Sequence, residues 1–267
     1  MLIALDTATE WCSVGVASTD LSDMLIVSRK VGCGHSAYLV PMLDDLLLQR
    51  KMSFSAVTGI VITVGPGSFT GLRIACGVAH GLALNQNLPI VALSTLEVIA
   101  QRYSAQTLPT VVCLDARMGE LYCAVFDSDG FRLVEDFVAR PDAVSARVIA
   151  ELGTNRFNAA GNGWAIVTTQ KTAMFQAINQ RDEYAYPQAA DLLRLGALQL
   201  VTENRSDGNS VQSGARNNRW LAKDALPLYV RNDVALDLAA QRQLRDANDQ
   251  SKSQNQLNLQ TTKALLQ

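Results

Sequence analysis

The sequence lacks the features that would place a 267-residue chain in a membrane or in a secreted disulfide scaffold. No apolar run approaches the roughly 18 to 20 residues that a membrane-spanning helix needs. The N-terminal "MLIALDTATE" has no basic leader before its apolar run, so no signal peptide is expected. The cysteines show no C-x-x-C spacing, and they stand at Cys12, Cys33, Cys76, Cys113 and Cys123. We therefore expect reduced thiols, a cytoplasmic location and no membrane partner.

Positive charge and histidine are also scarce. The formal net charge is −2, with 23 Lys and Arg against 25 Asp and Glu. Because a chain that binds nucleic acid by itself usually carries a basic face, any role on RNA would need a partner to supply most of the positive field. The two histidines, His35 and His80, complete neither a zinc motif nor a Ser-His-Asp set. No metal site and no hydrolase triad are expected.

What the sequence does contain is a repeat of itself. Residues 3–17, "IALDTATEWCSVGVA", match the pattern of residues 112–126, "VCLDARMGELYCAVF". Each stretch has an apolar strand that ends in an aspartate (Asp6 or Asp115), a polar turn and a second strand. A third strand and a helix follow, with helices predicted at 36–50 and 141–152. The repeat indicates a duplicated unit, with chance similarity of two hairpins as the alternative.

Strands alternate with helices in the rest of the chain, which is typical of α/β layers with a mixed sheet. A duplicated unit of this order predicts the actin-like and Hsp70-like (ASKHA) superfold, with two mixed-sheet subdomains and helices. Further strands are expected at 57–64, 89–94 and within 159–167. Further helices are expected at 70–85, 95–104, near 172–179 and at 188–203.

The chain divides into four segments on this interpretation. Residues 1–104 form the first subdomain, completed by the helix at about 188–204, and residues 105–187 form the second. Residues 205–237 hold a polar loop and the motif "PLYVRNDVA". Residues 238–267 contain no aromatic residue, Pro, Gly or Cys, and ten of these thirty residues are Gln or Asn. Because such a segment buries too little apolar surface to offset its ordering entropy, we expect a disordered tail.

The segment "GPGSFTGLRI" (65–74) stands where a predicted strand passes into a helix, as phosphate loops do. A Walker loop would need a lysine, and the dinucleotide motif would need a glycine where Thr70 stands. A tight turn for packing is therefore the alternative to a nucleotide loop. The candidate phosphate or nucleotide residues are Asp6, Thr7, Gly65, Gly67 and Ser68.

In ATP-using members of this superfold, a glycine-rich turn of the second half also meets the phosphates, and here that turn, Arg117–Glu120, fits phosphate poorly. It has one glycine, a bulky Met118 and an acid, Glu120, that would repel phosphate. A conventional ATP clamp between the halves is therefore incomplete. We expect no cofactor on this chain alone.

Two predicted helices carry apolar faces that could serve a partner. In the helix at 36–50 the stripe consists of Leu39, Met42, Leu43 and Leu46, at helical spacing. For this stripe, burial in the chain's own core is an equal alternative. The helix after the glycine segment has no polar face, and such a helix is buried on both sides. The predicted interface residues there are Gly71, Arg73, Ala75, Gly77 and Ala79.

Four motifs, in this order, resemble the TsaB (YeaZ) family over about residues 1–235. They are "LDTAT" (5–9), "GPGSFTGLRI" (65–74), "LDARMGELY" (114–122) and "PLYVRNDVA" (227–235). The resemblance implies the duplicated actin-like fold. It also implies a subunit that works with its paralogue TsaD and the ATPase TsaE. Together they place a threonylcarbamoyl group on the adenosine beside the anticodon of tRNA.

The resemblance further implies that this subunit is a non-catalytic scaffold. The catalytic paralogue binds its metal through H-x-x-x-H, where this chain reads "STLEVIA" with Thr95 and Ile99 at the two positions. Thr is a poor metal ligand and Ile is none. ATP and a metal are therefore expected on the partner subunits. The subunits are expected to pair through the glycine segment and the two helices, as a homodimer when alone and as a heterodimer with the paralogue.

Other interpretations stay open at this point. An actin-like small-molecule kinase or ATP-binding protein is the first alternative, and a peptidase-like protein is the second. Basic residues around Trp220 suggest a minor RNA contact through Arg216, Arg219 and Lys223, with a solvated loop as its alternative.

Overall fold

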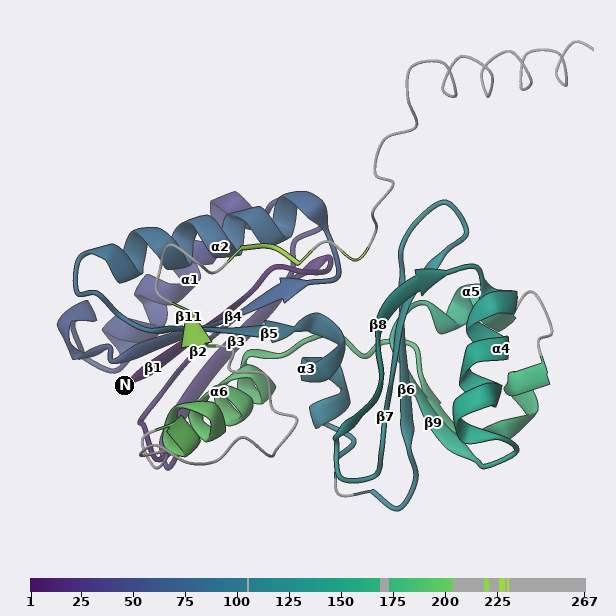
Figure 1. Ribbon diagram of the computed structural model, residues 1–267. Coiled ribbons are helices and arrows are strands. Elements are labelled where there is room, and N and C mark those ends of the chain that lie inside the picture. The colour runs from purple at the N-terminus through teal and green to yellow at the C-terminus, as the bar shows by residue number, and fades with distance from the viewer. Residues whose placement is uncertain (105, 169–172, 204–218, 221–225, 229, 231–267) are drawn as a thin grey trace, which may run out of the picture. The chain divides into compact units, whose positions relative to one another are not determined.

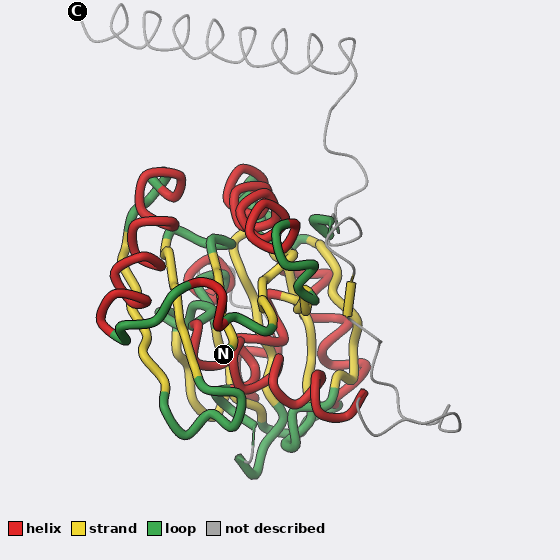
Figure 2. Tube along the Cα trace, turned by 90° about the vertical axis from the view of Figure 1, so that its left-hand side faces the viewer, coloured by secondary structure: helices red, strands yellow, loops and turns green. Residues whose placement is uncertain are grey.

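The chain is described by a computed structural model over residues 1–104, 106–168, 173–203, 219–220, 226–228 and 230 (Figure 1). Met1–Val230 belong to one unit, which contains two β-sheets with their helices (Figure 2). Within these described ranges, no helix is long and apolar enough to cross a membrane.

The first sheet has six strands in the order β11-β5-β4-β1-β2-β3. They are β1 Leu2–Asp6, β2 Trp11–Ala17, β3 Met24–Lys30, β4 Gly59–Gly65, β5 Ile90–Ser94 and β11 Arg219–Trp220. β1 pairs antiparallel with β2 and parallel with β4, so the sheet is mixed as predicted. β11 pairs antiparallel with β5 and brings the C-terminal part of the chain back to this sheet.

Helices cover both faces of the first sheet. α1 (His35–Gln49) and α2 (Phe69–Leu84) pack on the face that contains Ile3 and Leu5. α6 (Ala189–Glu203) packs on the opposite face, against Leu2 and Ala4. Because successive strand residues point to opposite faces and both faces are buried, β1 is apolar almost throughout. A short 3-10 helix, η1 (Phe54–Ala56), precedes β4.

The second sheet has five strands in the order β10-β9-β6-β7-β8. They are β6 Thr110–Asp115, β7 Leu121–Phe126, β8 Arg132–Ala139, β9 Phe157–Ala160 and β10 Ile178–Asp182. One face is covered by α4 (Pro141–Leu152), α5 (Trp164–Thr168) and the 3-10 helix η2 (Ala173–Ala177). α3 (Thr95–Gln101) comes from the first half and packs on the other face.

The duplication is confirmed. The order β3-β2-β1-β4-β5 in the first sheet matches β8-β7-β6-β9-β10 in the second, with the same parallel and antiparallel pairings. The predicted α/β class with two mixed sheets, and hence the duplicated actin-like fold, is therefore correct.

Two predictions for the second half are wrong in detail. The strand expected within 159–167 ends at Ala160, because Gly161 turns the chain at a φ of 103° and α5 begins at Trp164. The helix expected near 172–179 is only the 3-10 turn η2, and Ile178–Asp182 form β10 instead. Parallel pairing with β9 overrides the local helical pattern there.

Some predictions lie outside the described residues. They include the RNA contacts Arg216 and Lys223, the polar loop before Arg219 and the tail 238–267. Arg219 itself begins β11 on the edge of the first sheet.

Candidate functional site

The glycine segment 65–71 lies directly on the turn between β1 and β2. A Cβ added to Gly67 would lie 2.4 Å from the carbonyl oxygen of Ala8. A Cβ added to Gly71 would lie 1.9 Å from the carbonyl oxygen of Thr7. Both glycines therefore allow a close approach between two stretches of backbone, which no other residue type would permit here.

Hydrogen bonds fix the same contact. The Ser68 amide donates to the Ala8 carbonyl at 2.7 Å, and the Thr7 hydroxyl donates to the Gly71 carbonyl at 2.7 Å. Ser68 also caps α2, because its Oγ accepts from the Gly71 amide at 3.2 Å. Two N–H groups at the start of α2 thus have partners inside the chain, where a phosphate loop would offer them to a ligand.

Asp6 lies fully buried at the end of β1. Its Oδ1 accepts from the Thr63 hydroxyl at 2.5 Å and from the Ala8 amide at 3.4 Å. Its Oδ2 has no hydrogen-bond partner among the described residues. Burial raises the pKa of Asp6 to about 7, and the two hydrogen bonds only partly oppose this rise. Near neutral pH, Asp6 is therefore about half protonated and attracts a cation less than an exposed carboxylate would.

Of the five candidate phosphate residues, Asp6 and Thr7 lie at the β1–β2 turn, and Gly67 and Ser68 contact this turn, whereas Gly65 packs on Leu228 and Leu72. The glycines and hydroxyls serve packing, which favours the tight-turn interpretation. Binding of a nucleotide at this place stays a prediction.

The second half has an equivalent contact that the sequence analysis missed. Gly161 and Gly163 lie on β6, where an added Cβ would stand 2.3 Å and 2.9 Å from the Cys113 carbonyl oxygen. Between them, the Asn162 side chain accepts from the Asp115 amide at 3.0 Å. A signal was available, because G-x-G follows the fourth strand of both halves. Arg117–Glu120 form the turn between β6 and β7, as predicted from the repeat, and Arg117 pairs with Asp115 at 3.3 Å.

The predicted apolar stripe of α1 needs correction. Its residues are between 0% and 7% exposed and belong to the core under the first sheet, namely Leu39, Met42, Leu43 and Leu46. α1 and α2 share one face of the sheet, so the stripe is needed to cover its own strands. The burial therefore favours the alternative that the stripe serves the chain's own core, and the stripe is not exposed for a partner.

The predicted face of α2 divides into two. Gly71, Ala75 and Ala79 are buried against the chain's own core, so they are not exposed for a partner. Arg73 and Gly77 are exposed, and Phe69 and Gly81 extend the exposed row at intervals of four residues. Phe69 is 45% exposed.

The exposed row Phe69-Arg73-Gly77-Gly81 has open space at its two glycines. An added Cβ at Gly77 or Gly81 would meet nothing within 4 Å. The Arg73 guanidinium lies 3.6 Å from the centre of the Phe69 ring, which holds both side chains at the N-terminal end of the row. The row therefore combines an aromatic–arginine pair with two positions where another backbone could come close.

The positions of the missing metal ligands lie in the core. Thr95 and Ile99 are both fully buried, and Ile99 belongs to the cluster between α3 and the second sheet. In the part of the chain that the structure describes, no group of three or more His, Cys, Asp or Glu residues could hold a metal ion.

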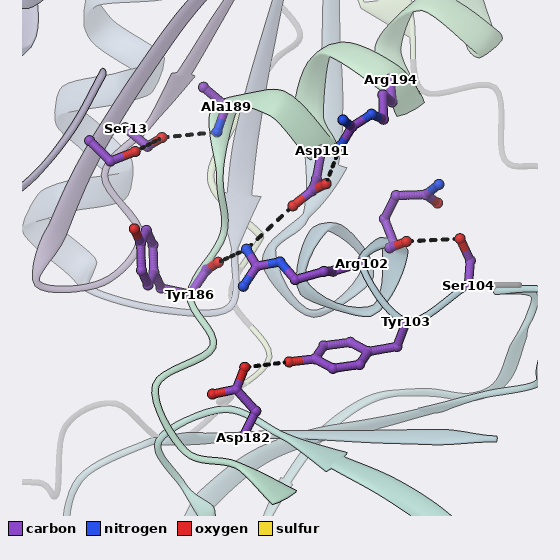
Figure 3. A network of polar contacts seen from close by, with 11 residues as sticks. Ser13, Arg102, Tyr103, Ser104, Asp182, Tyr186, Ala189, Asp191 and Arg194 are labelled. Atoms are coloured by element: carbon purple, nitrogen blue, oxygen red, sulfur yellow. Dashed lines mark hydrogen bonds and ion pairs between the residues drawn. The ribbon is translucent and has the colours of Figure 1, made fainter. Parts of the chain in front are cut away.

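Polar contacts tie together the two connections between the halves (Figure 3). The chain leaves the first half after α3, where Arg102 donates to the Tyr186 carbonyl at 3.2 Å and pairs with Asp191 at 3.4 Å. The Tyr103 hydroxyl donates to Asp182 at 2.7 Å, where β10 ends and the chain returns. Side chains of the outgoing connection, Arg102 and Tyr103, thus bind the returning connection at two places.

A second polar cluster joins β5 and α3 to β8. The Ser94 hydroxyl donates to Asp136 at 2.6 Å, and Arg132 pairs with both Asp136 and Glu97. Burial raises the pKa of Glu97 and of Asp136, while the neighbouring Arg132 guanidinium opposes the rise. The halves are therefore held together by charged groups as well as by the α3 contact.

Comparisons with known proteins agree with the motifs. The family model described as TsaD, tRNA N6-adenosine threonylcarbamoyltransferase, matches residues 26–213. The tRNA threonylcarbamoyladenosine biosynthesis protein TsaB of Escherichia coli is 31% identical over 244 residues, which cover 88% of this chain and 96% of that protein. The Haemophilus influenzae protein of the same name is 26% identical, over 87% of this chain and 94% of its own length.

Two solved structures from Pseudomonas aeruginosa are also similar. One is described as an uncharacterized protein with similarity to peptidase YEAZ. Its TM-score is 0.71 at 32% identity, and the match covers 86% of this chain and 99% of that one. The other is YeaZ, with a TM-score of 0.67 at 30% identity, covering 85% and 99% of the two chains.

Proposed function

Because the chain belongs to the TsaB (YeaZ) family of tRNA threonylcarbamoyladenosine biosynthesis proteins, we propose that it is a non-catalytic scaffold subunit. It acts with a TsaD-like catalytic paralogue and a TsaE-like ATPase, which carry the metal and ATP. tRNA is reached through the assembled complex. The single observation that carries this role is the exposed row Phe69-Arg73-Gly77-Gly81 on α2, in which Gly77 and Gly81 face open space.

The row suits close pairing with another helix. Glycines on an exposed helix face let a second backbone approach, and ridges of the partner can then enter the groove. Aromatic and Arg side chains are frequent anchors at interfaces, and Phe69 and Arg73 already lie against each other. The partner on this row is the TsaD-like paralogue. A second copy of this chain covers the row when the paralogue is absent.

The absence of catalysis is supported by three features of the described residues. The metal-ligand positions hold buried Thr95 and Ile99. The glycine segment uses its polar groups on the β1–β2 turn, and Asp6 is only partly ionised near neutral pH. Each feature weakens or removes a group that metal-dependent or phosphate-dependent transfer chemistry would need.

The test is a bulky side chain on the open row. Gly77→Trp should fold, because its Cβ meets open space, yet it should weaken binding to the paralogue more than about fivefold by overpacking the contact. tRNA modification by the reconstituted complex should fall with it. Affinity is measured by calorimetry after circular dichroism has confirmed folding. Ala75→Trp is not a suitable probe, since Ala75 is fully buried and the change would disturb the core.

The matched control is Ala146→Trp, on an exposed position of α4 in the second half. It adds the same side chain to a helix surface away from α2. It should leave affinity and modification unchanged. Normal pairing and modification by folded Gly77→Trp would contradict the proposed pairing row.

A further inference from the structure

A short C-terminal segment, Leu226–Leu228, lies at the carboxyl end of β4. The Leu228 amide donates to the Val64 carbonyl at 2.6 Å. The ladder between β4 and β5 is irregular at this point, since Thr63 pairs with Leu93 and Gly65 with Ser94. Val64 is thus the extra residue in the ladder, and its carbonyl is satisfied by a residue more than 160 positions away in the sequence.

Gly65 is enclosed between this segment and α2. Its φ of 122° is a conformation that favours glycine, and an added Cβ would lie 2.7 Å from the Leu228 carbonyl oxygen. The same Cβ would lie 3.1 Å from a methyl group of Leu72, in the first turns of α2. Gly65 therefore lies between the backbone of Leu228 and the side chain of Leu72.

The segment is held by its backbone more than by its side chains. Leu226 is 66% exposed and Leu228 is 41% exposed, while Val64 and Leu72 beneath are buried. Apolar side chains that stay in solvent contribute little to attachment. The specific contribution of the segment is thus one backbone hydrogen bond and the packing on Gly65, where the chain leaves the sheet for α2.

We propose that Leu226–Leu228 is a strap that fixes the glycine segment, and with it the start of α2. Gly65 and Leu228 are then positioning residues for partner binding, an inference that rests on the proposed pairing through the α2 row. A loop that is ordered before binding loses less conformational entropy when the partner arrives. Phe69 and Arg73 stand within eight residues of Gly65, so their placement depends on where the segment directs the helix.

The hydrogen bond can be removed without removing the segment. Leu228→Pro deletes the amide donor, whereas Leu228→Ala keeps the donor and shortens only a partly exposed side chain. Hydrogen exchange of amides 67–72 is measured in the full-length isolated protein, followed by calorimetric affinity for the paralogue. Leu228→Pro should speed exchange at least fivefold and weaken pairing about fivefold, the effect of one lost hydrogen bond. Leu228→Ala should stay within about twofold of the unaltered protein in both measurements.

A second variant approaches the contact from the other side. Gly65→Ala keeps the Leu228 amide and introduces a Cβ against its carbonyl, so it should speed exchange in the same amides. Unchanged exchange in both Leu228→Pro and Gly65→Ala would overturn the strap. Faster exchange with unchanged affinity would overturn the positioning role. If the unaltered protein does not bind the paralogue at all, the proposed function fails, and exchange alone still decides the strap.

Discussion

In both halves of the molecule, a helix begins at glycines that lie close to the backbone of another segment, but the segments that they contact differ. In the first half, Gly67 and Gly71 lie on the β1–β2 turn and lead into α2, which has 16 residues. In the second half, Gly161 and Gly163 lie on β6 and lead into α5, of which the structure describes 5 residues. The glycine contact therefore does not determine the length of the helix that follows it.

The strand-end aspartates differ in the same way. Asp6 is fully buried beneath the glycine segment of the first half. Asp115, its equivalent, is partly exposed and pairs with Arg117. The first half thus buries its strand-end aspartate, while the second half leaves its aspartate partly exposed. If the chain pairs through α2, a buried and rigid contact at the start of α2 helps to hold that helix in place for the partner.

The largest expected difference between the halves is the pH dependence due to Asp6. Its pKa of about 7 in the folded protein exceeds the ordinary value of about 3.9. Below pH about 4 the Asp6 carboxyl is protonated in both the folded and the unfolded state, so its burial lowers the free energy of unfolding least in this range. As the pH rises from about 4 through 7, the unfolded chain ionises first, so up to about 4 kcal/mol of stability is lost. Asp6→Asn should remove this slope.

Urea unfolding between pH 4.5 and 8 measures the effect. Asp115→Asn is the matched control, because it removes one negative charge at the equivalent strand end and leaves Asp6 intact. The control should retain the slope of the unaltered protein. If Asp6→Asn also retains the pH dependence of stability, Asp6 is ionised in the folded protein. The description of Asp6 as an enclosed carboxyl group would then be incorrect.

A methyl group at the two glycine contacts gives the next largest difference. Gly71→Ala places its Cβ 1.9 Å from a backbone oxygen, so the turn or the helix must move, at a cost of about 3 kcal/mol. Gly163→Ala places its Cβ 2.9 Å from the nearest backbone atoms, which smaller shifts relieve at about 1 kcal/mol. Free energies of unfolding in urea test the order. A larger loss in Gly163→Ala would show that the second contact is the tighter one.

Much of the fold could be predicted from the sequence, because its signals are local. The apolar strands, the strand-end aspartates and the helix that follows the third strand repeat along the chain, and the sheet order repeats with them. Gly65–Pro66–Gly67 was recognisable as a turn. Its counterpart at Gly161 was missed because α5 is too short for a helical pattern to be visible.

The candidate site was less predictable, because the burial of a side chain depends on which sheet or helix its own element packs against. Leu43 and Ala75 stand at apolar helical spacing, which is the same whether the face meets the chain's own sheet or another chain. Both are buried, because α1 and α2 share one face of the first sheet. The exposed Gly77 was predicted from spacing alone. The contact of Leu228 with Gly65 joins residues far apart in sequence and could not be predicted at all.

The connections between the halves offer a smaller effect. Tyr103→Phe removes the hydroxyl that donates to Asp182 at 2.7 Å and leaves that carboxylate with one partner fewer. Stability should fall by about 1.5 to 3 kcal/mol, the usual contribution of a hydrogen bond to a charged group. Tyr184→Phe, on a side chain that is 88% exposed in the returning connection, should change stability by less than about 0.5 kcal/mol. Equal effects of the two changes in thermal unfolding would show that the connections are not joined through Tyr103.

The smallest effect has the opposite sign and tests why α2 keeps its glycines. Gly77 lies inside α2, is exposed, and has open space where a Cβ would stand. Glycine in the middle of a helix is less stable than alanine by about 0.5 to 1 kcal/mol. Gly77→Ala should therefore stabilise the isolated chain by that amount in urea unfolding, whereas Gly71→Ala in the same helix destabilises it. If Gly77 is retained for pairing, the same Gly77→Ala should bind the paralogue less tightly, since even one methyl group separates two backbones in close contact. A stabilised variant that binds as well as the unaltered protein would show that the row does not meet a partner backbone at Gly77.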